Sequence, residues 1–250
     1  MGKWSYRLAK LPGLPAMQSA LQAGINFIDT AEAYVNGTSE GIVGDLVKGL
    51  PRDNYIGNYL CPADAPVKSL QKSLERLGLD YVDIYLPRVE LGLTKTVGVA
   101  NYDRKDVLEM KAELAKYDIP LAVNQCEFNV LRRYPEISSE GFMKTWRAEG
   151  IFFQSYSSLA ESITYRFSSY DMEVVEPVLE VLQRIGERRG KRVSSVALNS
   201  NISKGALPLV GIGNPEQAKD ALEALGWRLT KDQVDKVSTE GKKAVLWQQG

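Results

Sequence analysis

Short apolar runs alternate along the chain with longer stretches in which apolar and polar residues are mixed. The apolar runs have the length of buried strands and are bounded by polar or turn-forming residues. They predict strands at Asn26–Asp29, Tyr55–Leu60, Val82–Leu86, Thr96–Ala100, Leu121–Asn124, Ile151–Ser155 and Leu207–Val210.

Between most of these runs, apolar residues recur with the spacing of an amphipathic helix. Ser39 and Asn214 stand where N-caps are expected, and Gly78, Gly190 and Gly226 stand where helices end. The predicted helices are SEGIVGDLVKGL, PVKSLQKSLERLG, DRKDVLEMKAELAKY, EVVEPVLEVLQRIGERRG and NPEQAKDALEALG.

Strands and helices in alternation favour a parallel sheet with crossover helices. About eight such units in roughly 250 residues is the size of a (β/α)8 barrel of the TIM type. An open doubly wound sheet is the alternative, but no GxGxxG follows the first predicted strand. We therefore predict an α/β protein in which residues 1–250 form a single barrel domain.

The pattern supplies seven strands, whereas a barrel needs eight. KWSYRLAKL, at residues 3–11, is the candidate for an incomplete first strand. A second irregularity lies between Leu86 and Thr96, where only PRVELGLTK, residues 87–95, joins two predicted parallel strands. A crossover of that length is too short for an ordinary helix. We expect this crossover helix to be missing or displaced.

Composition removes several classes of function. The chain has 250 residues, with 31 basic and 31 acidic side chains and no histidine. This balance argues against a nucleic-acid surface, and no apolar run has the length of a membrane span. The N-terminus is too polar for a signal peptide. Cys61 and Cys126 lack metal-site spacing, so we expect buried thiols and no metal centre.

The segment GINFIDTAEAY places Asp29 at the end of an apolar strand, with Tyr34 five residues later. A carboxylate in such a place needs a compensating partner, because removing a charge from water is costly. Asp29 either caps the turn after its strand or belongs to a polar site at the strand end.

Six successive motifs resemble the signatures of aldo-keto reductases, and the sequence is most similar to the plant and cyanobacterial members. They are GINFIDTAEAY, SLQKSLERLGLDYVDIYL, TVGVANY, LAVNQCEFNVLRR, SYSSLA and LPLVGIGNPEQAKDALEALGW. The resemblance runs from about Ala20 to Glu240. It implies a (β/α)8 barrel that reduces carbonyl compounds with NADP(H) and without a metal, here in a degenerate and shortened form.

The resemblance also implies a catalytic set of aspartate, tyrosine, lysine and histidine. Asp29 and Tyr34 match the first two, whereas Leu60 replaces the lysine and Arg88 replaces the histidine. An unassisted phenol has a pKa near ~10 and is a poor proton donor at neutral pH. Arg88 is the expected new partner of Asp29, because a guanidinium can pair with a carboxylate.

The cofactor positions that the resemblance implies are partly kept. Asn124 and Gln125 correspond to residues that hold the nicotinamide carboxamide, with Asn101 in the same set, and Tyr156 corresponds to the residue that stacks under the ring. Simple packing is the alternative for both Tyr34 and Tyr156. The remaining positions are Ser157, Leu159, Gly211, Asn214, Gln217 and Asp220.

The phosphate end of this cofactor site lacks the positive charge that the resemblance implies. A helix that opens at Asn214 would favour an anion, but Gly213 stands where related sequences carry a lysine, and neither Gln217 nor Asp220 is cationic. We therefore expect NADP(H) binding to be weak or absent. Ser200 and Asn201 stand at positions that are usually apolar, which predicts a changed surface or a missing neighbour.

Three functions follow. The first is a pseudoenzyme that serves as a structural or binding subunit of a larger assembly, with a protein partner covering the region around residues 87–95. The second is a residual NADP-dependent carbonyl reductase, and the third a non-catalytic NADP(H)-binding sensor. The resemblance favours a plastid over the cytoplasm.

Overall fold

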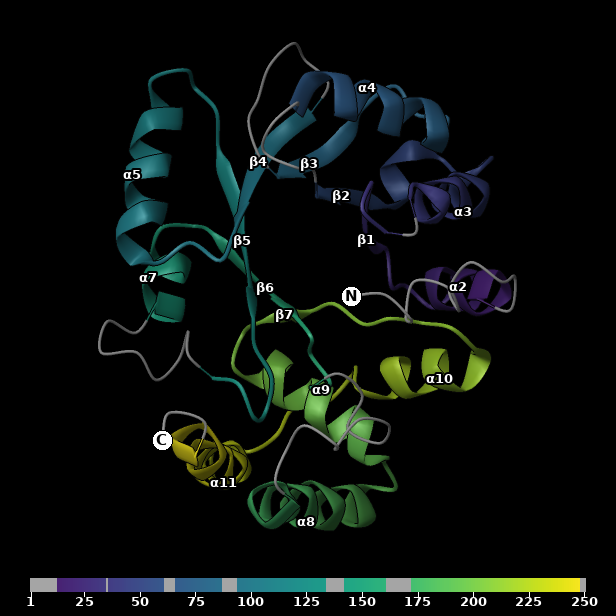
Figure 1. Cartoon of the computed structure of the whole chain (residues 1–250). Helices are drawn as coiled ribbons and strands as arrows, with labels where there is room; N and C mark the ends of the chain where they lie inside the picture. The colour runs from purple at the N-terminus through teal and green to yellow at the C-terminus, as the bar shows by residue number, and fades with distance from the viewer. Residues whose placement is uncertain are drawn as a thin grey trace. The chain divides into compact units, whose positions relative to one another are not determined.

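The computed structural model describes residues 13–34, 36–60, 66–86, 94–133, 142–160 and 172–247. Its strands form one seven-stranded sheet in the order β1-β2-β3-β4-β5-β6-β7 (Figure 1). The pairs β1–β2, β2–β3, β3–β4 and β6–β7 are parallel. A doubly wound sheet would contain a point where the strand order reverses. The sequential order therefore confirms the predicted α/β class and rules out the doubly wound alternative.

The strands agree with the predicted ones to within a few residues at their ends. β5 continues three residues beyond Asn124, and β7 is shorter than predicted. Their bounds are Phe27–Ala31 for β1, Ile56–Leu60 for β2, Val82–Leu86 for β3, Thr94–Ala100 for β4, Leu121–Glu127 for β5, Phe152–Tyr156 for β6 and Leu207–Pro208 for β7.

The five predicted helices are present as α3, α4, α5, α8 and α10, and others accompany them. The bounds are Gly13–Gln22 for α2, Thr38–Val47 for α3, Pro66–Leu77 for α4, Arg104–Ala115 for α5, Phe142–Ala148 for α7, Met172–Arg189 for α8, Val193–Ser203 for α9, Pro215–Glu223 for α10 and Lys231–Trp247 for α11; a 3-10 turn covers Arg52–Asn54.

The two irregularities of the pattern have different outcomes. Residues 3–11, the proposed first strand, lie outside the described residues. The short crossover is real: β3 and β4 pair directly in parallel, with Val82 opposite Thr94, and only residues 87–93 join them. Parallel strands ordinarily need a connection of about a dozen residues or more. Residues 87–93 lie outside the described residues, and a connection of that length is too short for an ordinary crossover helix.

Contacts divide the chain into two compact units. The first comprises Met1–Ala100, Lys105–Val123 and Ile212–Ala218, and the second comprises Asn101–Arg104, Asn124–Gly211 and Lys219–Gly250. In the first unit, apolar side chains of α3 and α4 pack on β2 and β3 (Figure 1). They meet Tyr59 and Tyr85, which are almost fully buried. β2 in turn pairs with β1, which carries Asp29, the first of the predicted catalytic residues.

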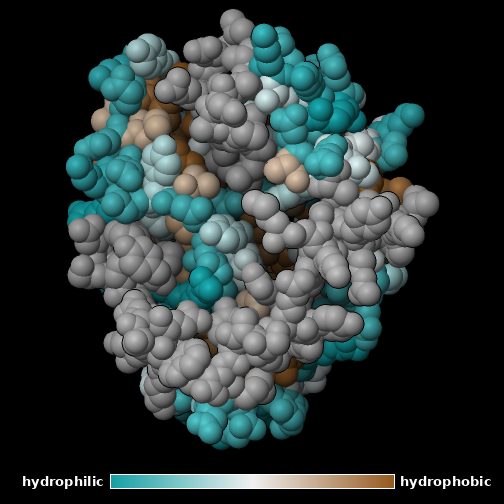
Figure 2. Space-filling model, in the orientation of Figure 1, coloured by the Kyte–Doolittle hydropathy of each residue, from teal (hydrophilic) through white to brown (hydrophobic). Residues whose placement is uncertain are grey.

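In the second unit, α8, α9 and α11 share an apolar core (Figure 1). A second cluster joins α7 to the sheet, where the rings of Trp146 and Phe128 lie 5.2 and 5.4 Å from that of Phe153. Hydrophilic residues cover the exposed sides of α4 and α8 on the face that Figure 2 shows. That distribution is the one expected of amphipathic helices.

α9 corrects an expectation about surface. Ser200 and Asn201 are buried rather than exposed, and so is Asn199. The Asn201 amide donates to the carbonyl oxygens of Phe128 and Ser158, and that of Asn199 to two carbonyls that follow α10. The two asparagine side chains satisfy backbone groups inside the unit, whereas the buried Ser200 hydroxyl has no hydrogen-bond partner among the described residues.

The N-cap of α3 is a second correction. The helix begins at Thr38, with Gly37 as its N-cap, so Ser39 is not the cap. The Ser39 hydroxyl instead lies 2.9 Å from that of Thr30 on β1. Asn214 is confirmed as the residue that precedes α10 and accepts a hydrogen bond from the helix.

The described residues bear on two further expectations. Cys126 is a buried free thiol, as predicted, and burial raises its pKa to about 12; Cys61 lies outside the described residues. In the part of the chain that the structure describes, no helix is both long and apolar enough to cross a membrane. Within the same residues, no acidic or cysteine side chains gather as a metal-binding group.

Candidate functional site

Asp29 lies on β1 in register with Asn58 on β2. The Asn58 amide, which is fully buried, donates a hydrogen bond of 2.6 Å to Asp29 Oδ1. A neutral amide is therefore one of the partners of Asp29. An asparagine inside the apolar run YIGNYL was the signal for this contact, but only the strand register connects it to Asp29.

Tyr34 follows in the turn after β1, and its side chain is 43% exposed. The partly buried position of the phenol and, second, the negative charge of Asp29 raise its pKa to about 12. The phenol is therefore protonated at neutral pH and is a weak acid. The direction of this shift is opposite to the one that a neighbouring cation would cause.

Of the two positions where the expected catalytic lysine and histidine are replaced, only Leu60 lies among the described residues. Leu60 is the last residue of β2 and is in register with Ala31 and Leu86. Arg88 lies outside the described residues, so its expected pairing with Asp29 stays a prediction. Within the described residues, Asn58 is the partner of Asp29 that the motifs did not reveal.

The second unit brings the predicted nicotinamide residues together at the ends of β4, β5 and β6. The Asn101 backbone N–H donates to the Gln125 carbonyl at 2.8 Å, and the Tyr156 hydroxyl donates to Asn101 Oδ1 at 3.2 Å. Asn101 is exposed and has a left-handed φ of 59°. The exposed amide and the half-buried phenol form a polar surface at these strand ends.

Asn124 and Gln125 lie deeper and are buried. The Asn124 amide donates to the Tyr102 carbonyl at 2.9 Å, and the Gln125 amide donates to Gln154 Oε1 at 3.0 Å. These contacts hold the two side chains in place behind Asn101 and Tyr156. Burial is also the main cause that raises the Tyr156 pKa, followed by the charge of Glu127.

Ser157 and Leu159 have local structural roles.

 Ser157 has a left-handed φ of 49°, and its carbonyl accepts hydrogen bonds from the Asn129 amide and from the Ala160 N–H. Leu159 is partly buried and packs against the core of α8, α9 and α11. Both residues therefore shape the turn that follows β6, directly beyond Tyr156.

The start of α10 is occupied by its own side chains. The Gly213 N–H donates to Gln217 Oε1 at 2.7 Å, and the Gln217 N–H donates to Asn214 Oδ1 at 2.9 Å. This arrangement is similar to a capping box, except that Gln217 accepts from Gly213, the residue before the N-cap, and Pro215 has no N–H to offer. Residues 211–217 also contain no lysine or arginine, whereas they include Glu216. The helix start has little left with which to bind an anion.

Asp220, on the same helix, belongs to the second unit and has partners there. Its carboxylate accepts a hydrogen bond of 2.8 Å from the Ser194 hydroxyl and lies 3.4 Å from Arg192 Nε. Gly211 precedes the helix in an exposed position. The contacts of Asp220 join α10 to the start of α9, which is a structural role.

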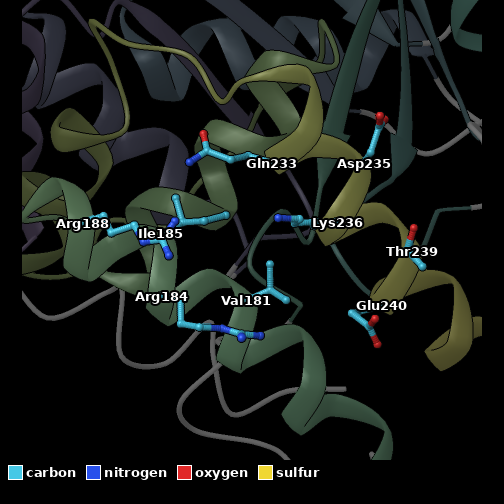
Figure 3. Close-up of a pocket in the computed structure, with 9 residues that line it drawn as sticks. All are labelled: Val181, Arg184, Ile185, Arg188, Gln233, Asp235, Lys236, Thr239 and Glu240. Carbon is cyan, nitrogen blue, oxygen red and sulfur yellow. The ribbon is translucent and has the colours of Figure 1, made fainter.

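A surface cavity of about 440 Å³ lies between α8 and α11 (Figure 3), and its described lining includes none of the predicted site residues. Arg184 and Arg188 line it from α8, and Lys236 and Glu240 line it from α11. Because both signs of charge are present, the cavity has no simple preference for a cation or an anion.

The model of the Aldo/keto reductase family matches residues 7–87 and 88–239, which together span most of the chain. The protein belongs to the aldo/keto reductase family. The two matched segments meet between Pro87 and Arg88, which is where the short connection from β3 to β4 begins. The boundary between the two matched segments thus coincides with the short connection.

Curated relatives of this protein include several reductases. It is 30% identical to the chloroplastic pyridoxal reductase of Arabidopsis thaliana, with 97% of this chain and 81% of the relative aligned. It is 27% identical to an NADPH-dependent codeinone reductase of Papaver somniferum, over 89% of this chain and 79% of the relative.

Solved structures agree on the fold. A thermostable aldo-keto reductase, Tm1743, superposes with a TM-score of 0.75 at 23% identity, over 91% of this chain and 86% of the other. An aldo/keto reductase of Klebsiella pneumoniae in complex with NADP and acetate has a TM-score of 0.74 at 21% identity, over 91% of this chain and 84% of the other. The protein therefore has the α/β fold of these reductases.

Proposed function

We propose that the protein is an NADP(H)-dependent reductase of aldehydes or ketones, with Tyr34 as the proton donor. The observation that carries the proposal is the arrangement on β1 and β2, where the buried Asn58 amide donates to Asp29 and a partly exposed phenol follows β1. The relatives named above are reductases, which favours turnover over the structural-subunit role that the replaced residues suggested.

The residues at the ends of β4, β5 and β6 fit the nicotinamide end of the cofactor. Asn101 and Tyr156 present an amide and a phenol to solvent, and the buried amides of Asn124 and Gln125 lie behind them. The phosphate end fits less well, because the N–H groups of Gly213 and Gln217 already have acceptors. We therefore infer that the cofactor binds weakly. When bound, it would supply the hydride.

Tyr34 would meet the negative charge that develops on the substrate oxygen. Reduction of a carbonyl adds a hydride to carbon and a proton to oxygen, so a positioned O–H group lowers the barrier. With a pKa near 12, the phenol is always in the donor form at neutral pH. Asn58 carries no charge and cannot stabilise the phenolate that remains, so we expect slow turnover.

Turnover with a reactive aldehyde tests this proposal. We expect the unmodified chain to oxidise NADPH in the presence of the aldehyde, and Tyr34→Phe to lower kcat by about 100-fold or more, because it removes the proton donor. Tyr117→Phe is the matched control, since Tyr117 is 70% exposed on another segment. Equal rates in the native chain and in Tyr34→Phe would refute the role of Tyr34.

Binding of the cofactor without turnover is the second candidate function. The raised pKa of Tyr34 and the neutral partner of Asp29 favour it. The double variant Leu60→Lys, Arg88→His restores both expected catalytic groups. If the native chain binds NADPH without turnover and the double variant gains turnover, the protein is a cofactor-binding sensor; a native rate that the double variant does not improve favours the reductase.

A plastid location belongs to the same proposal. Its support is the chloroplastic pyridoxal reductase among the relatives. Detection of the protein in purified plastids by mass spectrometry would support this location, and its recovery in the cytosolic fraction alone would contradict it.

A further inference from the structure

The segment that carries Tyr34 is a tight turn between β1 and α3. The Tyr34 N–H donates to the Ala31 carbonyl at 3.0 Å, and the Gly37 N–H donates to the Glu32 carbonyl at 2.9 Å. The Tyr34 side chain is 43% exposed, so packing alone does not fix its direction. Other contacts must determine where the phenol lies.

Arg76, near the end of α4, contacts this turn at both ends. Its Nη2 lies 3.6 Å from Glu32 Oε1, before Tyr34. Its Nε donates to Glu40, a fully buried carboxylate in the first turn of α3, after Tyr34. One planar guanidinium thus joins the two residues that flank the phenol, which a lysine could not do with the same geometry.

Gly37 shows how closely the arginine passes the turn. The residue has a left-handed φ of 82°, and a Cβ atom there would lie 2.8 Å from Arg76 Nε. A side chain at this position would therefore both strain the backbone and displace the guanidinium. The Ser73 hydroxyl accepts a third contact from Arg76, at 3.2 Å, and holds the arginine on its own helix.

We propose that Arg76 is a positioning residue, which fixes the turn from Glu32 to Glu40 and thereby the direction of the Tyr34 phenol. This inference rests on the proposed function, in which Tyr34 donates the proton. A displacement of about 1 Å in a reacting group can cost on the order of 100-fold in rate. Loosening one end of the turn should therefore lower kcat without changing the KM for the cofactor.

Glu32→Gln is the most direct test, because it removes the contact with the turn and leaves the buried pair of Arg76 and Glu40 in place. We expect about a 10-fold lower kcat and an unchanged KM for NADPH. Arg76→Lys keeps a charge beside Glu40 but cannot hold both carboxylates, so it should give a similar loss. Glu75→Gln removes an exposed charge from the neighbouring position on α4 and is the matched control.

The same substitution in a Tyr34→Phe background shows whether the effect passes through the phenol. We expect Glu32→Gln to change the residual rate less than about twofold there, because coupled residues are not additive. An equal loss in both backgrounds, or a native-like kcat in Glu32→Gln, would overturn the inference alone. If the native chain does not depend on Tyr34, the proposed function fails and this inference fails with it.

Discussion

At the scale of single residues, the candidate site combines an amide–carboxylate hydrogen bond with a phenol of raised pKa. Asp29 accepts a hydrogen bond from the amide of Asn58, and the phenol of Tyr34 has a raised pKa. An amide satisfies the carboxylate but adds no positive charge. The arrangement therefore gives the Asp29 carboxylate a partner on β2, while the Tyr34 phenol is a weak acid.

Asn58→Ala should reveal what this amide contributes to stability. Because the substitution takes a buried donor away from a carboxylate, we expect the free energy of unfolding to fall by about 1–3 kcal/mol. Urea unfolding followed by circular dichroism measures the change. Asn54→Ala, at an exposed position before β2, is the control and should stay within about 0.5 kcal/mol of the native chain. Equal stability of the two variants would contradict the importance of the Asn58–Asp29 contact.

At the scale of elements, the start of α10 shows how side chains of a helix can occupy N–H groups that an anion would otherwise bind. Its first N–H groups are directed to Asn214 and Gln217, as in an ordinary isolated helix. The macrodipole still favours an anion there, but Glu216 opposes it and no cation lies within residues 211–217. The helix therefore forms, but its start offers a phosphate few N–H groups and no cation.

Gly213→Lys should restore part of that capacity. Gly213 has ordinary backbone angles, and a Cβ there would meet only the side chain of Gln217, at 3.3 Å. A charge-assisted hydrogen bond to the 2′-phosphate is worth about 1.5–3 kcal/mol, so we expect the Kd for NADPH to fall by about 10-fold or more. NADH, which lacks this phosphate, is the matched control ligand in isothermal titration calorimetry. A parallel gain for both cofactors would contradict a phosphate contact at this position.

At the scale of the whole molecule, the short connection between β3 and β4 is the main irregularity in the alternation of strands and helices. On β3, Asp83 is held by Arg52 at 2.6 Å and by Lys95 of β4 at 3.3 Å, and Arg52 also stacks on Tyr81. These contacts bind β3 to β4 near their starts.

We propose that another protein chain covers the region around residues 87–95. The short connection between β3 and β4 is the observation behind this proposal, and we expect the purified chain to associate through that region. Light scattering over a range of protein concentrations measures the association. Hydrogen exchange of β3 and β4 should slow as concentration rises, with β6 as the internal control. A monomer whose β3 and β4 amides are protected at every concentration would exclude this proposal.

The sequence by itself determined the order and type of most elements. Strand-length apolar runs and helical spacing are local properties, and so is the Asn214 cap of α10, because each depends on residues within one or two turns. The same holds for the short crossover, since chain length alone limits what residues 87–93 can form. The family motifs then placed Asp29, Tyr34 and the amide residues at strand ends.

Only the tertiary structure decided which side chains meet. The register of β1 with β2 pairs Asn58 with Asp29, and α4 brings Arg76 to the turn that carries Tyr34. The buried Asn201 of α9 likewise finds its acceptors on distant segments. Hydrogen bonds between residues far apart in sequence follow from strand register and helix packing, and no local pattern encodes either.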